Sequence, residues 1–168
     1  GLQASFSPLP FAGTVGNGAH QHLSLHKDVV PLFSGGSGPY GIRADGGAAI
    51  GGIIVGLPDI QGFLTGSVLS GSRLAPGTWS GAYLCWGLEN REASVRFLNE
   101  GQSNPHGANV EVKIVDPSAN VYLASAAILA LALNGIRGGL RLPAEIPGDP
   151  GRLSDDERQR ANVRLLAN

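Results

Sequence analysis

Apolar and polar residues alternate at the end of residues 14–25, which predicts a strand there. From position 19 onward, one face carries small or aliphatic side chains together with Gln21. The other face carries His20, His22 and Ser24. Because successive side chains of a strand point to opposite faces, the pattern predicts that these three polar groups point the same way.

A second alternating run predicts another strand over residues 108–115. It places Glu111 and Lys113 on one face and aliphatic residues on the other. Two apolar segments, residues 83–88 and 93–97, are also predicted to be strands. The polar residues 99–107 between them and the alternating run predict a turn.

Two apolar segments rich in small residues, 42–55 and 57–64, predict helices that break just before Pro58. Proline disfavours a helical conformation in the residue that precedes it. Glycine is a poor helix former, so the many glycines of this segment predict a close approach by another backbone. Those glycines are at positions 46, 47, 51, 52 and 56.

Residues 116–135 predict a third helix, with Asp116 as its N-cap, Pro117 in its first turn and Gly135 at its C-terminal end. Its sequence is apolar on almost every side, which predicts a core helix.

The polar residues of the C-terminal part predict a change in organisation after residue 142. Residues 1–142 are interpreted as one domain, and residues 143–168 as a polar connector toward a further helical segment. Within the connector, the charged residues 155–160 predict a short helix.

Residues 67–80, rich in Gly, Ser and Pro, predict a long loop. The mixture of strands and helices predicts an α+β fold.

Composition narrows the classes of function. The chain has 168 residues, the length of one domain or part of one, and 12 basic residues against 13 acidic ones. This balance argues against a nucleic-acid partner. The lone Cys85 lies in an apolar run and is predicted to be a buried small hydrophobe. The apolar stretch over residues 119–133 is shorter than the ~20 residues that cross a bilayer, so we predict no membrane association and a cytoplasmic location.

The polar strand faces predict a site for a metal and a phosphate. His and Glu together are suitable ligands for a divalent metal ion. The guanidinium groups of Arg91 and Arg96 match the oxygen atoms of phosphates and carboxylates. Taken singly, a His-x-His pair is also typical of ordinary hydrogen-bonded strand residues, and two arginines are also typical of surface charge.

Four motifs together resemble the glutamine synthetase superfamily, in the order of that family. They are GNGAHQHLSL (16–25), SRLAPG (72–77), ENREASVR (89–96) and VEVKIVDPSANVYLASAAIL (110–129). The resemblance covers residues 14–135 but only the C-terminal half of the family's catalytic domain. It implies an antiparallel sheet that carries the site and is backed by helices.

The resemblance also implies a reaction: ATP phosphorylates the γ-carboxylate of glutamate, and an amine then displaces the phosphate. The implied cofactors are ATP and Mg²⁺ or Mn²⁺. His20 and Glu111 correspond to metal ligands of the family, and His22, Ser24 and Arg96 correspond to nucleotide contacts.

Further positions correspond to residues that handle glutamate and the transferred phosphoryl group. Arg73 corresponds to the residue that binds the α-carboxylate of glutamate, and it is also counted among the catalytic residues. Gly16 leaves room for the backbone to approach the glutamate substrate. Arg91 matches the residue that stabilises the transferring phosphoryl group. Lys113 stands where the family usually has a substrate-binding Arg. Asn109 replaces another usual Arg, which puts one phosphate contact in doubt.

Trp79 occupies the position of a loop glutamate that deprotonates ammonium in glutamine synthetases. An indole cannot take a proton, but it attracts organic ammonium groups. Trp79 therefore indicates resemblance to the γ-glutamylpolyamine or γ-glutamylamide synthetase branch, with glutamate and an organic amine as substrates. Two alternatives stay open: an ammonia-using glutamine synthetase in which Trp79 only packs the loop, and a non-catalytic synthetase-like module.

The family's remaining metal ligands would precede residue 1, so we expect this chain alone to bind nucleotide weakly and not to turn over. The resemblance further implies a ring-shaped homo-oligomer for the full-length protein.

Overall fold

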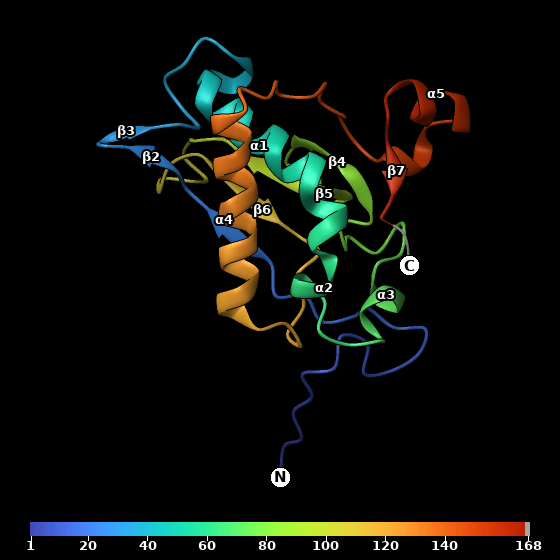
Figure 1. The fold of residues 1–168 in the computed structure, drawn as a ribbon. Coiled ribbons are helices and arrows are strands. Elements are labelled where there is room, and N and C mark those ends of the chain that lie inside the picture. Colours follow the sequence, from blue (N-terminus) through green and yellow to red (C-terminus); the bar gives the residue numbers. More distant parts are fainter. Residues whose placement is uncertain (167–168) are drawn as a thin grey trace.

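A five-stranded sheet in the order β1–β6–β5–β4–β7 organises the computed structural model, which describes residues 1–166 (Figure 1). All neighbouring strands are antiparallel except β4 and β5, which run parallel. The sheet with its helices confirms the predicted α+β class. Its strands are β1 (Gln21–Leu23), β4 (Tyr83–Leu88), β5 (Ala93–Leu98), β6 (Asn109–Val112) and β7 (Arg164–Leu165).

The first predicted strand is much shorter than expected. Only Gln21–Leu23 pairs regularly with β6, although the backbone N–H of Ala19 still donates to the carbonyl of Val115 at 2.9 Å. Residues 14–18 are irregular because the backbone there bends around a neighbouring side chain, as described below. A small hairpin of β2 (His26–Lys27) and β3 (Val30–Pro31), which the pattern did not predict, follows β1.

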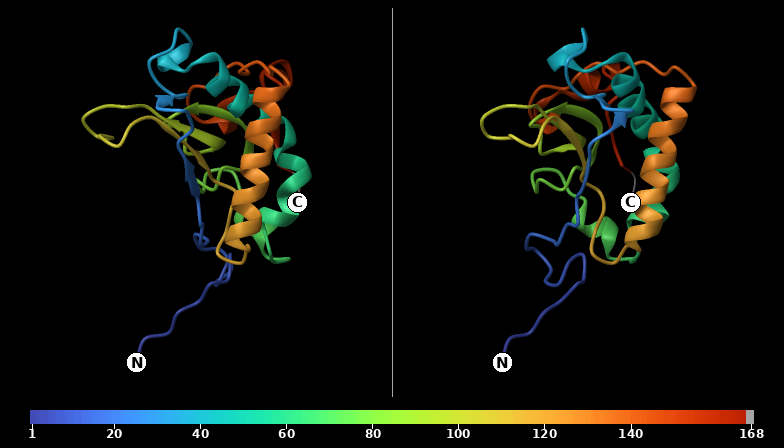
Figure 2. Two further views of the ribbon diagram at one scale, coloured as in Figure 1. Left: turned by 60° about the vertical axis from the view of Figure 1, so that its left-hand side comes forward. Right: turned by 90° about the vertical axis from the view of Figure 1, so that its left-hand side faces the viewer.

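The first predicted helix is confirmed and ends just before Pro58, as expected, but the second is a 3₁₀ turn followed by one short α-helix. α1 (Ala44–Gly56) leads through the 3₁₀ turn η2 (Leu57–Ile60) into α2 (Gln61–Leu64). The glycines of α1 meet another backbone, as predicted. A Cβ atom added at Gly52 would lie 2.7 Å from the Cα atom of Gly135 in α4 (Val121–Arg137). Figure 2 shows these two helices side by side on one face of the sheet.

The predicted start of α4 is wrong. The N-cap is Asn120, whose side chain accepts hydrogen bonds from the backbone N–H groups of Tyr122 and Leu123. The carboxylate of Asp116 instead accepts from the backbone and hydroxyl of Ser118, which closes a separate turn ahead of the helix. The helix also continues past Gly135 to Arg137.

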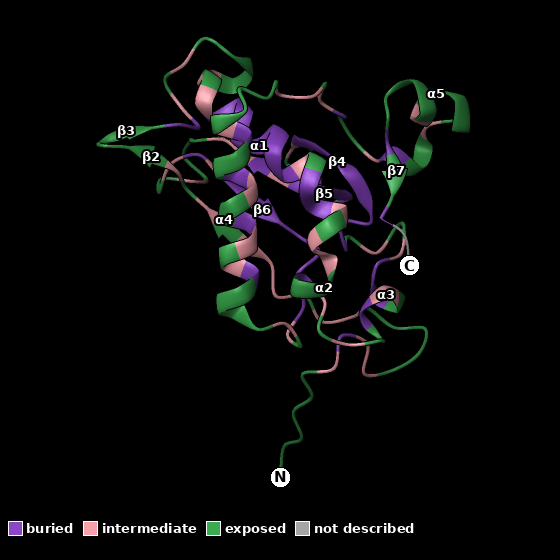
Figure 3. Ribbon diagram, in the orientation of Figure 1, coloured by how far each residue is buried: buried purple, intermediate pink, exposed green. Residues whose placement is uncertain are grey.

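The prediction that α4 is a core helix is also wrong. Only the stripe formed by Ala124, Ile128, Ala132 and Gly135 is buried. The remaining faces are largely exposed or half-buried, as Figure 3 shows along the outside of α4. The sequence did not reveal this exposure, because apolar residues also occupy the outward-facing positions of the helix.

The core lies between the sheet and the two long helices. Alternate residues of each strand point into it, and Trp86 and Phe97 pack edge to face with their ring centroids 6.3 Å apart. The opposite residues of β4, Tyr83 and Cys85, form a second cluster with Ile146 and residues farther along the chain. The predicted burial of Cys85 is confirmed.

The C-terminal segment packs against β4. The indole N–H of Trp86 donates to the carbonyl of Pro143 at 2.9 Å. The side chain of Asn90 donates to the carbonyls of Ile146 and Gly148. Beyond the 3₁₀ turn η3 (Pro150–Arg152), the predicted short helix is confirmed as α5 (Asp155–Arg160), which Ser154 caps.

Two further short elements complete the described fold: η1 (Pro39–Gly41) and α3 (Ser70–Arg73). The second lies inside the segment predicted to be a loop. The continuous helical run Ala44–Leu64 has 21 residues and is apolar enough to cross a membrane by length and composition. More than half of it is buried inside the protein, in the manner of a core helix.

Candidate functional site

A row of three polar residues crosses the sheet on the face opposite α1 and α4. His22 of β1 pairs in register with Glu111 of β6, which pairs with Arg96 of β5. The Arg96 Nη1 atom lies 3.2 Å from the Glu111 Oε2 atom, and the His22 Nε2 atom lies 3.8 Å from Oε1. The carboxylate of Glu111 is buried, so the guanidinium of Arg96 compensates a charge that water hardly reaches.

Lys113 lies on the same face and is buried as well. Its Nζ atom is 3.8 Å from the Oε1 atom of Glu111. Burial lowers the pKa of Lys113, and the neighbouring carboxylate of Glu111 opposes that shift. A lysine held in this way is a poorly solvated charge that gains from any anion placed nearby.

The His20 side chain is fixed by the backbone. Its Nδ1 atom lies 2.8 Å from the carbonyl oxygen of Lys113. The carbonyl can only accept, so Nδ1 donates and Nε2 keeps its lone pair in the neutral ring. Burial, followed by the Lys113 charge, lowers the pKa of His20. The backbone bond satisfies one ring nitrogen of this half-buried histidine and fixes the orientation of the ring.

Arg73 reaches the site from α3 and is buried. Its Nη2 atom donates to the carbonyl oxygens of Lys113 and Val115 at 3.2 and 3.3 Å. Burial lowers the pKa of Arg73, and the nearby Asp116 opposes the shift. The backbone of residues 14–18 bends around this side chain: a Cβ atom at Gly16 would lie 2.5 Å from the Arg73 Cγ atom.

Four of these residues, His20, Arg73, Arg96 and Lys113, line a cavity of about 270 Å³. Its lining holds four basic side chains and no carboxylate. Two of those guanidinium groups, on Arg73 and Arg96, each have an Nε atom without a hydrogen-bond partner. A cavity with this charge suits an anionic ligand such as a carboxylate or a phosphate. Its lining residues are Val15, Gly16, Gly18, His20, Arg73, Thr78, Trp79, Ser80, Arg91, Arg96 and Lys113.

Trp79 forms one wall of this cavity and is 63% exposed. The guanidinium carbon of Arg91 lies 5.3 Å from the centroid of its ring, within the range of a cation–π contact. One face of the indole is therefore engaged by Arg91. Any organic ammonium would use the other face or the ring edge.

His20 and Glu111 carry donor atoms of the kinds that bind divalent metal ions. His20 offers the free Nε2 atom, and the carboxylate of Glu111 keeps acceptor capacity beside its contacts to basic groups. Within residues 1–166, no three His, Cys, Asp or Glu side chains gather as a metal site. The donor chemistry thus fits such an ion but leaves its coordination incomplete.

Other residues singled out in the sequence have plainer surroundings. Ser24 is exposed and lies one residue beyond β1. The side-chain oxygen of Asn109 lies 2.8 Å from the His22 Nδ1 atom, so Asn109 orients the ring toward Glu111. The sequence reading missed Glu89, which forms an ion pair with Arg96, and the buried Glu92. Both lie close to Arg91 in the sequence ENRE (89–92). Two acidic residues beside a candidate arginine were the sequence feature that could have identified them.

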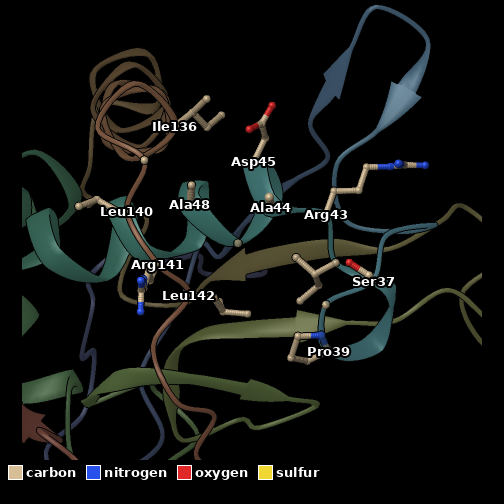
Figure 4. A pocket seen from close by; sticks show the side chains of 14 residues that line it. Ser37, Pro39, Arg43, Ala44, Asp45, Ala48, Ile136, Leu140, Arg141 and Leu142 are labelled. Atoms are coloured by element: carbon tan, nitrogen blue, oxygen red, sulfur yellow. The ribbon is translucent and has the colours of Figure 1, made fainter.

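A second cavity, of about 420 Å³, lies elsewhere, near the start of α1 (Figure 4). None of the candidate binding or catalytic residues lines it. Figure 4 shows the side chains of Arg43 and Arg141 extending in different directions. They do not converge on a common ligand, and much of the remaining lining is apolar.

Comparison with known proteins identifies relatives along the whole chain. A model of the glutamine synthetase catalytic domain matches residues 1–168. Gamma-glutamylpolyamine synthetase GlnA3 of Streptomyces coelicolor is 38% identical over 167 residues, which cover 99% of this chain and 36% of the relative. Glutamine synthetase of Thermococcus kodakarensis is 35% identical over 166 residues, with coverages of 99% and 36%.

A solved structure shows the same fold. The crystal structure described as a novel glutamine synthase homolog superposes with a TM-score of 0.73 at 34% identity. The match covers 87% of this chain and 36% of that one. The chain therefore spans little more than a third of the length of the relatives that it matches.

Proposed function

This chain belongs to the glutamine synthetase family, and we propose that it is part of an ATP-dependent ligase that joins glutamate to an organic amine. The observation that carries the proposal is the cavity with four basic side chains and no carboxylate. Glutamate and ATP are both anionic, and their phosphoryl transfer develops negative charge that such groups stabilise.

The proposed reaction has two steps. A γ-carboxylate oxygen of glutamate attacks the γ-phosphorus of ATP, and ADP leaves. The amine nitrogen then attacks the acyl carbon of γ-glutamyl phosphate, inorganic phosphate leaves, and the nitrogen loses a proton.

His20 and Glu111 are the residues that we propose hold Mg²⁺ or Mn²⁺. The neutral, carbonyl-oriented ring of His20 supports this role. When bound, the ion neutralises charge on the phosphates. We assign His22, Ser24 and Arg96 to the nucleotide.

The residues around Arg73 are assigned to glutamate. Arg73 and Lys113 present positive charge at the cavity wall. Gly16 has no side chain that would collide with Arg73. Arg91, which is exposed at the cavity, is assigned to the transferring phosphoryl group, where Arg73 also adds charge stabilisation.

Trp79 supports an organic amine rather than ammonia as the acceptor. Its indole offers an exposed apolar surface and has no group that takes a proton. The relative named as a γ-glutamylpolyamine synthetase supports the same choice. The second candidate is glutamine synthesis from ammonia, which the relatives named as glutamine synthetases favour.

Because the chain covers about a third of its relatives, the whole-protein properties are also proposals. They are a cytoplasmic location, the assembly of the complete protein into a homo-oligomeric ring, and the absence of turnover by this chain alone. The incomplete metal site supports the last point.

The test measures phosphate release by the complete protein that contains this chain. The assay supplies ATP, Mg²⁺ and glutamate and varies the amine among ammonium, ethanolamine, putrescine and spermine, with mass detection of the product. Turnover with organic amines alone supports the proposal, and turnover with ammonium alone supports the second candidate. His20→Ala is the inactive control.

A further inference from the structure

The loop that carries Trp79 has a backbone held in an unusual shape. Gly77, Trp79 and Gly81 all have positive φ angles, of 76°, 56° and 80°. Glycine adopts this region freely, but a residue with a side chain rarely does so unless its surroundings impose it. Hydrogen bonds inside the loop, from Thr78 and Ser80 to the carbonyl of Ala75, and contacts from outside it keep Trp79 in place at the cavity wall.

Glu92 is the group that reaches this loop. Its Oε1 atom accepts the backbone N–H of Trp79 at 2.7 Å, and its Oε2 atom accepts that of Gly77 at 3.1 Å. The residue is buried, with 5% of its surface exposed. Hydrogen bonds from amides to a shielded carboxylate are stronger than those between neutral groups.

The backbone of Glu92 is itself anchored. The side-chain oxygen of Asn90 accepts the backbone N–H of Glu92 at 3.0 Å. The amide nitrogen of Asn90 donates to the carbonyl of Ile146 at 2.8 Å. The loop is thus tied through Glu92 to a segment that is fixed on the sheet.

Neighbouring residues hold the two parts of Trp79. Glu92 binds its backbone, and Arg91 lies over its ring. Each carboxylate oxygen of Glu92 accepts one backbone amide of the loop.

We propose that Glu92 is the positioning residue that fixes the Trp79 wall of the acceptor-amine site, an inference that rests on the ligase function proposed above. Glu92 acts on the acceptor only through the loop and touches no substrate. Its removal loosens the wall while the glutamate and metal residues stay in place.

Backbone hydrogen exchange tests the contact without any activity. In the complete protein, the amides of Gly77 and Trp79 should exchange slowly, because both donate to a buried carboxylate. Glu92→Gln keeps only one acceptor oxygen, so at least one of the two amides should exchange about tenfold faster or more. Glu100→Gln, at an exposed position, is the matched control.

Steady-state kinetics test the role. With an amine that supports turnover, Glu92→Gln should raise the KM for that amine about tenfold and leave the KM values for ATP and glutamate unchanged. Glu92→Ala should raise it further if the variant folds, and its melting temperature reports folding.

Three results would overturn the inference. The first is fast exchange at both amides in the unaltered protein. The second is unchanged exchange in Glu92→Gln. The third is faster exchange with an unchanged amine KM. Absence of turnover with every amine refutes the ligase function and with it the acceptor role of Glu92, while exchange still reports the contact.

Discussion

The contact between α1 and α4 predicts that Gly52→Ala destabilises the protein although alanine is the better helix former. A Cβ atom at position 52 would lie 2.3 Å from the carbonyl oxygen of Leu131 and 2.7 Å from the Cα atom of Gly135. Both are backbone atoms, so the helices must separate by about 1 Å to restore ordinary contact.

Two effects oppose each other in this variant. Overpacking a close contact costs about 1–3 kcal/mol, and alanine in place of glycine stabilises a helix by about 1 kcal/mol. With rigid backbone on both sides, the upper part of the first range applies, and the net loss is about 2 kcal/mol. For a cooperative unit of this size, that lowers the melting temperature by about 4–8 °C.

Gly62→Ala provides the control. Gly62 is also helical, in α2, but an added Cβ atom would meet nothing within 4 Å. This variant should melt at the same temperature as the unaltered protein or slightly above it. Thermal unfolding of the complete protein, followed by circular dichroism, compares the two. Equal melting temperatures for Gly52→Ala and Gly62→Ala would refute the reasoning.

Three further predictions concern titration, nucleotide and metal. Burial raises the pKa of Cys85 to about 12; the unfolded thiol therefore ionises near pH 9 while the folded one keeps its proton, and the free energy of unfolding falls as the pH rises from about 9 to about 12. Urea titrations across that window should show a smaller fall in Cys85→Ala, and an equal fall would contradict the assignment. Arg96→Lys loses the two-pronged guanidinium that contacts both Glu111 and Glu89, so initial rates should show the KM for ATP raised about tenfold and the amine KM unchanged. Removal of divalent metal with EDTA should stop turnover, and His20→Ala should weaken Mn²⁺ binding, measured by electron paramagnetic resonance, by at least about tenfold; an unchanged affinity would exclude His20 as a ligand.

Short-range patterns predicted the parts of the fold that depend on local periodicity. The alternation around Glu111 and Lys113 placed both on the face that the structure shows, because a strand leaves only two choices. The break before Pro58 followed from the restriction that proline places on the residue before it.

Choices between equivalent groups could not be predicted in the same way. Asp116 and Asn120 are both good N-cap residues, and only the capture of Ser118 by Asp116 decides between them. The role of Glu92 escaped the sequence reading for a related reason. Its hydrogen-bond partners lie 13 and 15 positions away, and no periodicity connects them.

The anchoring of Asn90 to Ile146 and Gly148 also determines where the polypeptide tolerates a break. Asn90 is the residue next to Arg91, yet its own support comes from more than fifty positions later in the chain. A protease that cuts between Pro143 and Gly148 would remove no residue from the cavity. It would nevertheless weaken the support of the segment that carries Arg91. A cut far from the cavity in sequence would therefore disturb the site.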